Sequence, residues 1–372
     1  MWMKILLNAK CSKIDIFQYK NDCTVLCGAI TLSSDMVRNL IIFILLTGVT
    51  TSFAQDRKFL NPQLKFSAEY LPQSKFKGDS VEGKFSMTKA YAGFVFPVIS
   101  RRYALTNDLT YKSFVLLVNA NANYTLPNIT FLENKHQFLS ATAGPSLIFN
   151  SGNKNTWLAG FAAGIAQDMD IFSEITIRFT GHALFKRKVS GNFSYHLGAV
   201  YSYVYAQPAL LPLLGCVIRT SDKSKLKISL PVSVSFYYKT NEYDMLSVFI
   251  RPDGDQYMFS GYNEPMFAAS DPLSLRMRYR SFKTGFSYEI GLSNRLLIKP
   301  EVGMALNRRL SFTEGEVSDK SNIFKSDLHS APYVKFAFRI LLGDTRWRRN
   351  GDNFLLNDER LDYYDLDDPT KL

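Results

Sequence analysis

The side chains in this sequence that are best spaced for chemistry are basic residues on an alternating run. Arg276, Arg278 and Arg280 are separated by single apolar residues, and Lys283 follows after a phase slip that we expect near Ser281. A guanidinium group stays charged at any working pH and binds carboxylate or phosphate in a forked geometry. Along one wall of a pore, such a basic ladder would raise the local anion concentration, so small anionic solutes are candidate partners.

The same basic residues have an alternative, structural use. Acids on neighbouring runs, such as Glu289 and Glu301, could pair with them and stiffen a filled barrel. The sequence gives this second interpretation at least equal weight, because narrow barrels are commonly packed with side chains.

Catalytic and metal-binding motifs are absent from the sequence. The four histidines are His136, His182, His196 and His329, and none stands at a ligand spacing from another or from a cysteine. His182 and His196 fall on the polar faces of consecutive runs and could approach each other, but lumen-exposed histidines without a special role are the favoured interpretation. There is no G-x-S-x-G, P-loop or dinucleotide fingerprint. We therefore predict no catalytic, cofactor or metal site, and a protein that is not an enzyme.

The elements that must position these side chains are β-strands. In Leu226–Lys239 apolar and polar residues alternate, which is the period of a strand with one apolar face. About 3.3 Å per residue predicts a single strand longer than about 40 Å, whereas a tilted strand needs about 9–11 residues to cross a bilayer. We expect the apolar face, which includes Val234, to contact lipid, and Ser235 to face a wet lumen.

The same alternation recurs along most of the chain between residues 56 and 342. It is clear in Leu139–Phe149, Phe193–Tyr205 and Val334–Leu342, and turn-forming clusters such as Pro252–Asp255 separate the runs. With weaker runs included, the pattern predicts an all-β fold, a transmembrane antiparallel up-and-down barrel of about 12 strands, within a range of 10–14. A soluble β-sandwich also shows alternation, but long, often aromatic apolar faces favour the barrel.

The segments outside the barrel have their own expected roles. Residues 36–54 have the basic start, short apolar core and small residues of a signal peptide, with cleavage expected after Ala54. Residues 1–35 are interpreted as a start-site artefact or a leader extension, and residues 343–372 as a charged C-terminal tail. Cleavage would leave Cys216 as the one remaining cysteine, so no internal disulfide framework is expected.

The charge of the chain restricts its partners. The formal net charge is +11, but the basic residues are scattered over alternate strand positions and strand ends. Nucleic-acid binding requires a basic face or helix, so it is not predicted. The expected partners are the lipid bilayer and the outer-membrane assembly machinery, and the expected location is the cell outer membrane.

The layout also resembles a known group of proteins. The leader ending in Ser52–Gln55, the glycine- and aromatic-rich strands, and Leu211–Gly215 running into Leu226–Lys239 resemble uncharacterised outer-membrane β-barrel families of Bacteroidota, of the domain-of-unknown-function type. The resemblance covers about residues 56–342 and implies location and fold, not substrate. In one respect the chain departs from it: such barrels often end on an aromatic-ended last strand that the assembly machinery recognises, whereas here residues 343–372 follow the last expected strand.

These observations lead to three functional hypotheses. The first is a channel or transporter for small solutes or lipids. The second is a structural outer-membrane protein whose surface loops carry the function. The third, a barrel enzyme that acts on lipids, has the least support, because no local set of residues indicates it.

Overall fold

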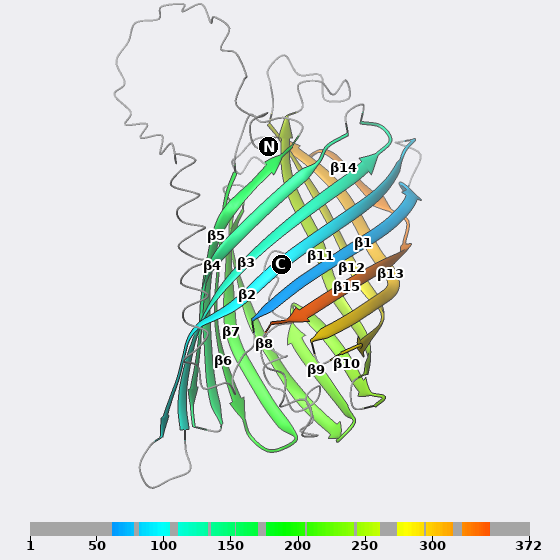
Figure 1. The fold of residues 1–372 in the computed structure, drawn as a ribbon. Helices are drawn as coiled ribbons and strands as arrows, with labels where there is room; N and C mark the ends of the chain where they lie inside the picture. Colours follow the sequence, from blue (N-terminus) through cyan, green and yellow to red (C-terminus); the bar gives the residue numbers. More distant parts are fainter. Residues whose placement is uncertain are drawn as a thin grey trace, which may run out of the picture. The chain divides into compact units, whose positions relative to one another are not determined.

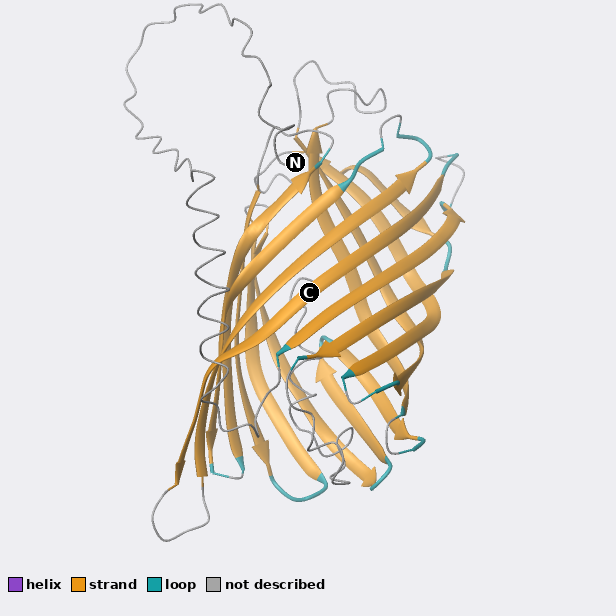
Figure 2. Cartoon of the chain, viewed as in Figure 1, coloured by secondary structure: helices purple, strands orange, loops and turns teal. Residues whose placement is uncertain are grey.

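The structure of the chain is a computed structural model. It describes residues 62–77, 82–104, 111–132, 135–152, 154–169, 176–204, 207–241, 244–260, 274–293, 295–314 and 322–342. All regular elements in these ranges are β-strands, and they curve into one barrel (Figures 1 and 2). The predicted signal peptide and the predicted charged tail lie outside the described residues.

The strands follow one another around the barrel in chain order. Their bounds are β1 Gln63–Lys75, β2 Lys84–Ala104, β3 Tyr111–Ile129, β4 Phe138–Ser151, β5 Asn155–Asp168, β6 Thr176–Lys188, β7 Phe193–Val204, β8 Gln207–Ser221, β9 Ser224–Leu230, β10 Ser233–Lys239, β11 Met245–Ser260, β12 Ser274–Gly291, β13 Leu296–Glu314, β14 Asn322–Leu328 and β15 Ala331–Leu341. Every pairing is antiparallel, and β15 pairs with both β13 and β1, which closes the barrel. We call the end where Gln63 pairs with Leu341 the terminal end, and the opposite end the distal end.

The barrel has 14 strands around its circumference, because β14 and β15 occupy one position. Both pair with β13, β14 with its distal part and β15 with its terminal part, and they are interrupted at His329 and Ser330. The predicted architecture is confirmed, and the observed number lies at the upper limit of the predicted range instead of at 12.

The segment Leu226–Lys239 is not the single long strand that its alternation predicted. It forms two strands of seven residues, β9 and β10, which pair with each other and are joined at Pro231 and Val232. Proline has a fixed φ and no backbone N–H, so it favours a turn at the centre of this run. Within the two strands the faces were predicted correctly: Phe236 is exposed on the outside, and Ser235 is buried inside. Val232, predicted on the outer face, lies in the turn and packs against inner side chains.

The outer surface of the barrel carries large exposed apolar side chains. On β1, β12 and β15 these include Phe66, Phe286 and Phe336, which are 43%, 57% and 53% exposed. The alternate residues of the same strands, such as Glu69 and Lys283, are buried inside. No helix in the described part of the chain is long and apolar enough to span a membrane.

Candidate functional site: the barrel lumen

The predicted basic ladder is divided between the two faces of β12. Arg278 and Arg280 are exposed, on the same face as Phe282, and Arg276 has the same parity but is buried. Lys283 alone faces the lumen, where it is fully buried. The four residues therefore do not line one wall.

The physical reason is the position of a β-bulge. The register between β12 and β13 shifts between Arg280 and Phe282. The extra residue lies on β13, where both Leu306 and Asn307 are exposed and Asn307 has a φ of 46°. A bulge reverses the faces of the strand that contains it, so β12 keeps its alternation through Ser281 and no phase slip brings its arginines inward.

Lys283 belongs to a layer of buried ion pairs that crosses the lumen. Its ammonium group lies 2.8 Å from Asp253 of β11 and also pairs with Glu69 of β1. Lys89 of β2 lies 3.2 Å from the same Asp253 oxygen and pairs with Asp255. These residues come from β1, β2, β11 and β12, so the layer joins strands that lie three to five positions apart in the wall.

A second ion pair extends this layer toward β13 and β15, the strands that close the barrel. Arg251 of β11 and Glu301 of β13 form a forked pair, with nitrogen–oxygen distances of 2.5 and 3.4 Å. The hydroxyl of Tyr333 donates to the same carboxylate at 2.9 Å, and the Lys283 ammonium lies 5.0 Å from the Tyr333 ring centre. Buried charges that are paired and hydrogen-bonded in this way avoid the cost of isolated burial.

Distal to the ion-pair layer, aromatic side chains fill part of the lumen. The rings of Phe138 and Tyr257 stack at 4.3 Å, and those of Phe85 and Tyr279 at 5.1 Å. The Tyr257 hydroxyl donates to the Thr125 hydroxyl at 2.8 Å. Each of these contacts joins β2, β3 or β4 to β11 or β12, so the distal lumen is packed on this side.

A second apolar group lines the inner wall on the other strands. We call it the apolar belt; its members, one or two from each strand between β2 and β8, are Val95, Val115, Leu117, Ile148, Leu158, Leu184, Val200 and Leu213. They alternate with outward residues such as Trp157 and Leu214, both more than half exposed. Val232, in the turn between β9 and β10, packs against the belt. The lumen therefore has an apolar inner wall beside the ion-pair layer.

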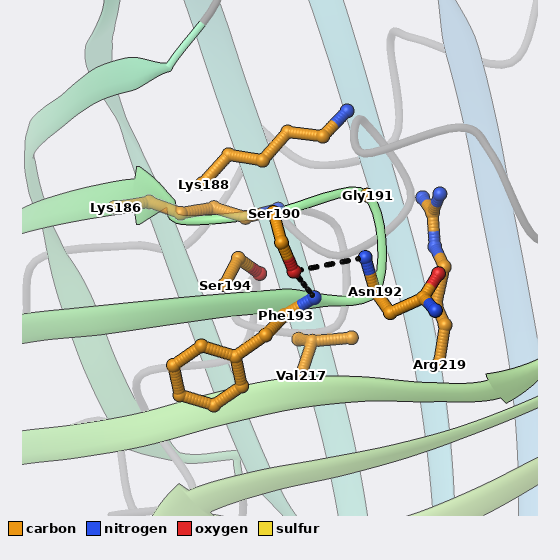
Figure 3. A pocket seen from close by; sticks show the side chains of 9 residues that line it. All are labelled: Lys186, Lys188, Ser190, Gly191, Asn192, Phe193, Ser194, Val217 and Arg219. Carbon is orange, nitrogen blue, oxygen red and sulfur yellow. Dashed lines mark hydrogen bonds between the residues drawn. The ribbon is translucent and has the colours of Figure 1, made fainter.

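The terminal mouth of the lumen is basic. Lys186, His196, Lys225 and Lys227 are buried on the inner face of β6, β7 and β9. A small surface pocket lies beside them, lined by Lys186, Lys188, Ser190, Gly191, Asn192, Phe193, Ser194, Val217 and Arg219. Figure 3 shows its centre, the β6–β7 turn, in which the Ser190 hydroxyl accepts from the backbone N–H groups of Asn192 and Phe193 at 3.3 and 3.1 Å.

The histidines do not form a shared site in the described part of the chain. In the pairing of β6 with β7, His182 lies opposite Val200 and His196 lies opposite Lys186, so the two histidines are offset by four residues along the strands. The His196 ring contacts the Ser229 hydroxyl at 3.0 Å, and His136 contacts Asp168 at 2.8 Å near the distal end. The described residues contain no group of three or more His, Cys, Asp or Glu side chains that could hold a metal ion.

Sequence comparison assigns the chain to a family. A model of the family described as a domain of unknown function, DUF6268, matches residues 53–341. The chain belongs to the DUF6268 family. A search of curated proteins found no match.

Several solved structures are similar to this DUF6268 chain. The monoaromatic hydrocarbon channel TodX, as its deltaS2 mutant, has 12% identity and a TM-score of 0.39 over 79% of this chain and 92% of its own. An outer membrane channel from Pseudomonas putida F1 has 7% identity and a TM-score of 0.38 over 77% of this chain and 98% of its own. The transport unit of the autotransporter AIDA-I from Escherichia coli has 7% identity and a TM-score of 0.31 over 81% and 97%.

Part of the ion-pair layer of this DUF6268 barrel was missed in the sequence. Pro252–Asp255 was interpreted as a turn, but it lies within β11, with Asp253 buried in the lumen. The spacing contained the signal, because carboxylates at positions 253 and 255 share one face of a strand. Proline and glycine between strands usually mark turns. The interpretation as a turn followed Pro252 and Gly254 and not the spacing of the two carboxylates.

Proposed function

We propose that this chain is an outer-membrane β-barrel that acts as a channel or transporter for small solutes, with the lipid bilayer and the outer-membrane assembly machinery as its partners. The outward apolar side chains support a bilayer environment. In hydrocarbon every backbone polar group needs a partner, so a closed barrel is the way for strands to span it.

The observation that carries the proposal is the size of the barrel. Barrels of about 8 strands are just wide enough to be filled by side chains, and those of 16–18 strands leave an aqueous channel. This barrel has 14 strands, and the ion-pair and aromatic layers join β1–β4 to β11–β15. These layers contain no described residue of β5–β10, and the inner wall of β5–β8 carries the apolar belt instead.

A second candidate function is structural. The aromatic contacts and the ion-pair layer make the distal part rigid, which suits a barrel whose surface loops carry the function. An enzyme has less support, because the serine and the acid contact different histidines: Ser229 contacts His196, and Asp168 contacts His136.

Ion conductance of the purified chain in a planar bilayer separates these functions. We expect discrete conductance steps from the wild-type protein. The Lys283→Met variant provides a comparison, because it disturbs the ion-pair layer and should change the size of the conductance steps. A folded wild-type barrel that shows no conductance, and admits no small solute into vesicles, would contradict the channel and leave the structural role.

A further inference from the structure

The hydrogen-bonded wall of the barrel has a break between β8 and β11. β9 pairs with β8 only from Leu214 toward the terminal end, and β10 pairs with β11 only up to Ile250. In the described part of the chain, residues 207–213 of β8 pair only with β7, and residues 251–260 of β11 pair only with β12. Figure 1 shows β9 and β10 as short arrows in the lower part of the view.

The break is large compared with a small molecule. The seven residues of β8 that have no described partner on the β9 side extend over about 20 Å at about 3.3 Å per residue. The two strands that end early leave two strand positions empty between the distal halves of β8 and β11. On the distal side the break is bounded where the Thr176 hydroxyl of β6 contacts the Met258 sulfur of β11 at 3.9 Å.

The sequence is adapted to unpaired strand edges at this place. Pro208 and Pro212 lie on the unpaired half of β8, Pro252 lies on that of β11, and Pro231 ends β9. Proline has no N–H to donate, and within sheets it is confined to edge strands, first positions and bulges. Fewer unpaired donors lower the cost of a strand edge that meets an apolar surrounding.

Both sides of the break are apolar. Leu210, Leu214 and Leu230 form its outer rim and are 69%, 53% and 55% exposed. On the inner side, Leu213 belongs to the apolar belt and Val232 packs against it. Ala209 has the inward parity of β8 and is nevertheless exposed, so the wall is uncovered on both of its faces here.

We propose that small, largely apolar solutes pass sideways through this break, between the lumen and the hydrocarbon of the bilayer. This inference rests on the proposed channel function and names its substrate class. The apolar belt gives such a solute a favourable inner surface, because apolar surface leaves water at a gain of about 25 cal/mol per Å². The axial route is filled on the β1–β4 side by the aromatic and ion-pair layers, whereas the lateral route is continuous with the outer apolar surface.

The test places a charge in the break without closing the lumen. Val232→Arg puts a guanidinium group on its inner rim, and Ala209→Arg puts one on the edge of β8. Val189→Arg is the matched control, because Val189 is 54% exposed in another turn, between β6 and β7. Folding of each variant is checked by its gel mobility without heating.

Two readings are compared for each folded variant: uptake of the apolar dye N-phenyl-1-naphthylamine by expressing Gram-negative cells, and ion conductance of the purified protein. We expect both break variants to lose the dye uptake that the wild type and Val189→Arg show, with conductance retained. Dye uptake that neither break variant reduces, in a protein that conducts, would overturn the lateral route. A wild-type protein with neither uptake nor conductance would overturn the proposed function itself.

Discussion

Replacing Lys283 with methionine tests whether the ion-pair layer stabilises the barrel. The Lys283 ammonium is fully buried and pairs with two carboxylates, those of Glu69 and Asp253. Methionine keeps much of the apolar length of the side chain but removes the charge. Lys89 still lies 3.2 Å from Asp253, whereas Glu69 loses the ammonium group that contacts it. Breaking a buried pair costs about 3–5 kcal/mol, because the remaining charge is left uncompensated.

The assay is urea unfolding of the barrel in lipid vesicles, followed by tryptophan fluorescence, to which Trp157 contributes from the outer surface, where it is 53% exposed. The matched control is Arg309→Met, because Arg309 and Asp327 form an ion pair at 2.7 Å with both side chains 45% exposed. An exposed pair contributes little to stability, because solvent screens its charges. If Lys283→Met lowers the free energy of unfolding no more than Arg309→Met does, the layer does not stabilise the barrel.

Two further predictions concern the wall. Phe286→Arg should destabilise the barrel by about 2–4 kcal/mol if Phe286 lies near the bilayer midplane, while Phe286→Leu should be tolerated. Unfolding in vesicles measures the stability of both variants. Equal effects would argue against lipid contact at this face. Gly144→Ala should prevent folding, because a Cβ at this position would overlap the backbone oxygen of Phe161, while Gly191→Ala should be tolerated because its Cβ would meet open space. Gel mobility without heating checks this pair, and a folded Gly144→Ala barrel would contradict the packing between β4 and β5.

The faces of the strands could be predicted from the sequence, because alternation is a local property. The alternation of Val334–Leu342 predicted one apolar face, and on β15 Val334, Phe336 and Phe338 are exposed together. The length of Leu226–Lys239 was predicted wrongly although the information was present. Pro231 stands at its centre, and the continuous alternation outweighed it.

The lumen could be predicted only in part, because its contacts depend on neighbouring strands. Alternation on β12 gives the relative faces of Arg280 and Phe282, but it does not say which of two paired strands contains a bulge. Here the extra residue lies at Asn307 of β13. The partners of Lys283 could not be found locally either, since Glu69 is 214 residues away in the chain.

That separation has a consequence for the order of folding events. Glu69 is on the first strand and Lys283 on the twelfth, and Arg308 donates to Ser74 across 234 residues. Contacts between residues so far apart require the loss of much chain entropy before they form, and folds dominated by them are slow to fold. We therefore expect the ion pairs of the lumen to form after the strands between them have paired. Until then their charges stay hydrated, and their burial accompanies the closure of the barrel instead of starting it.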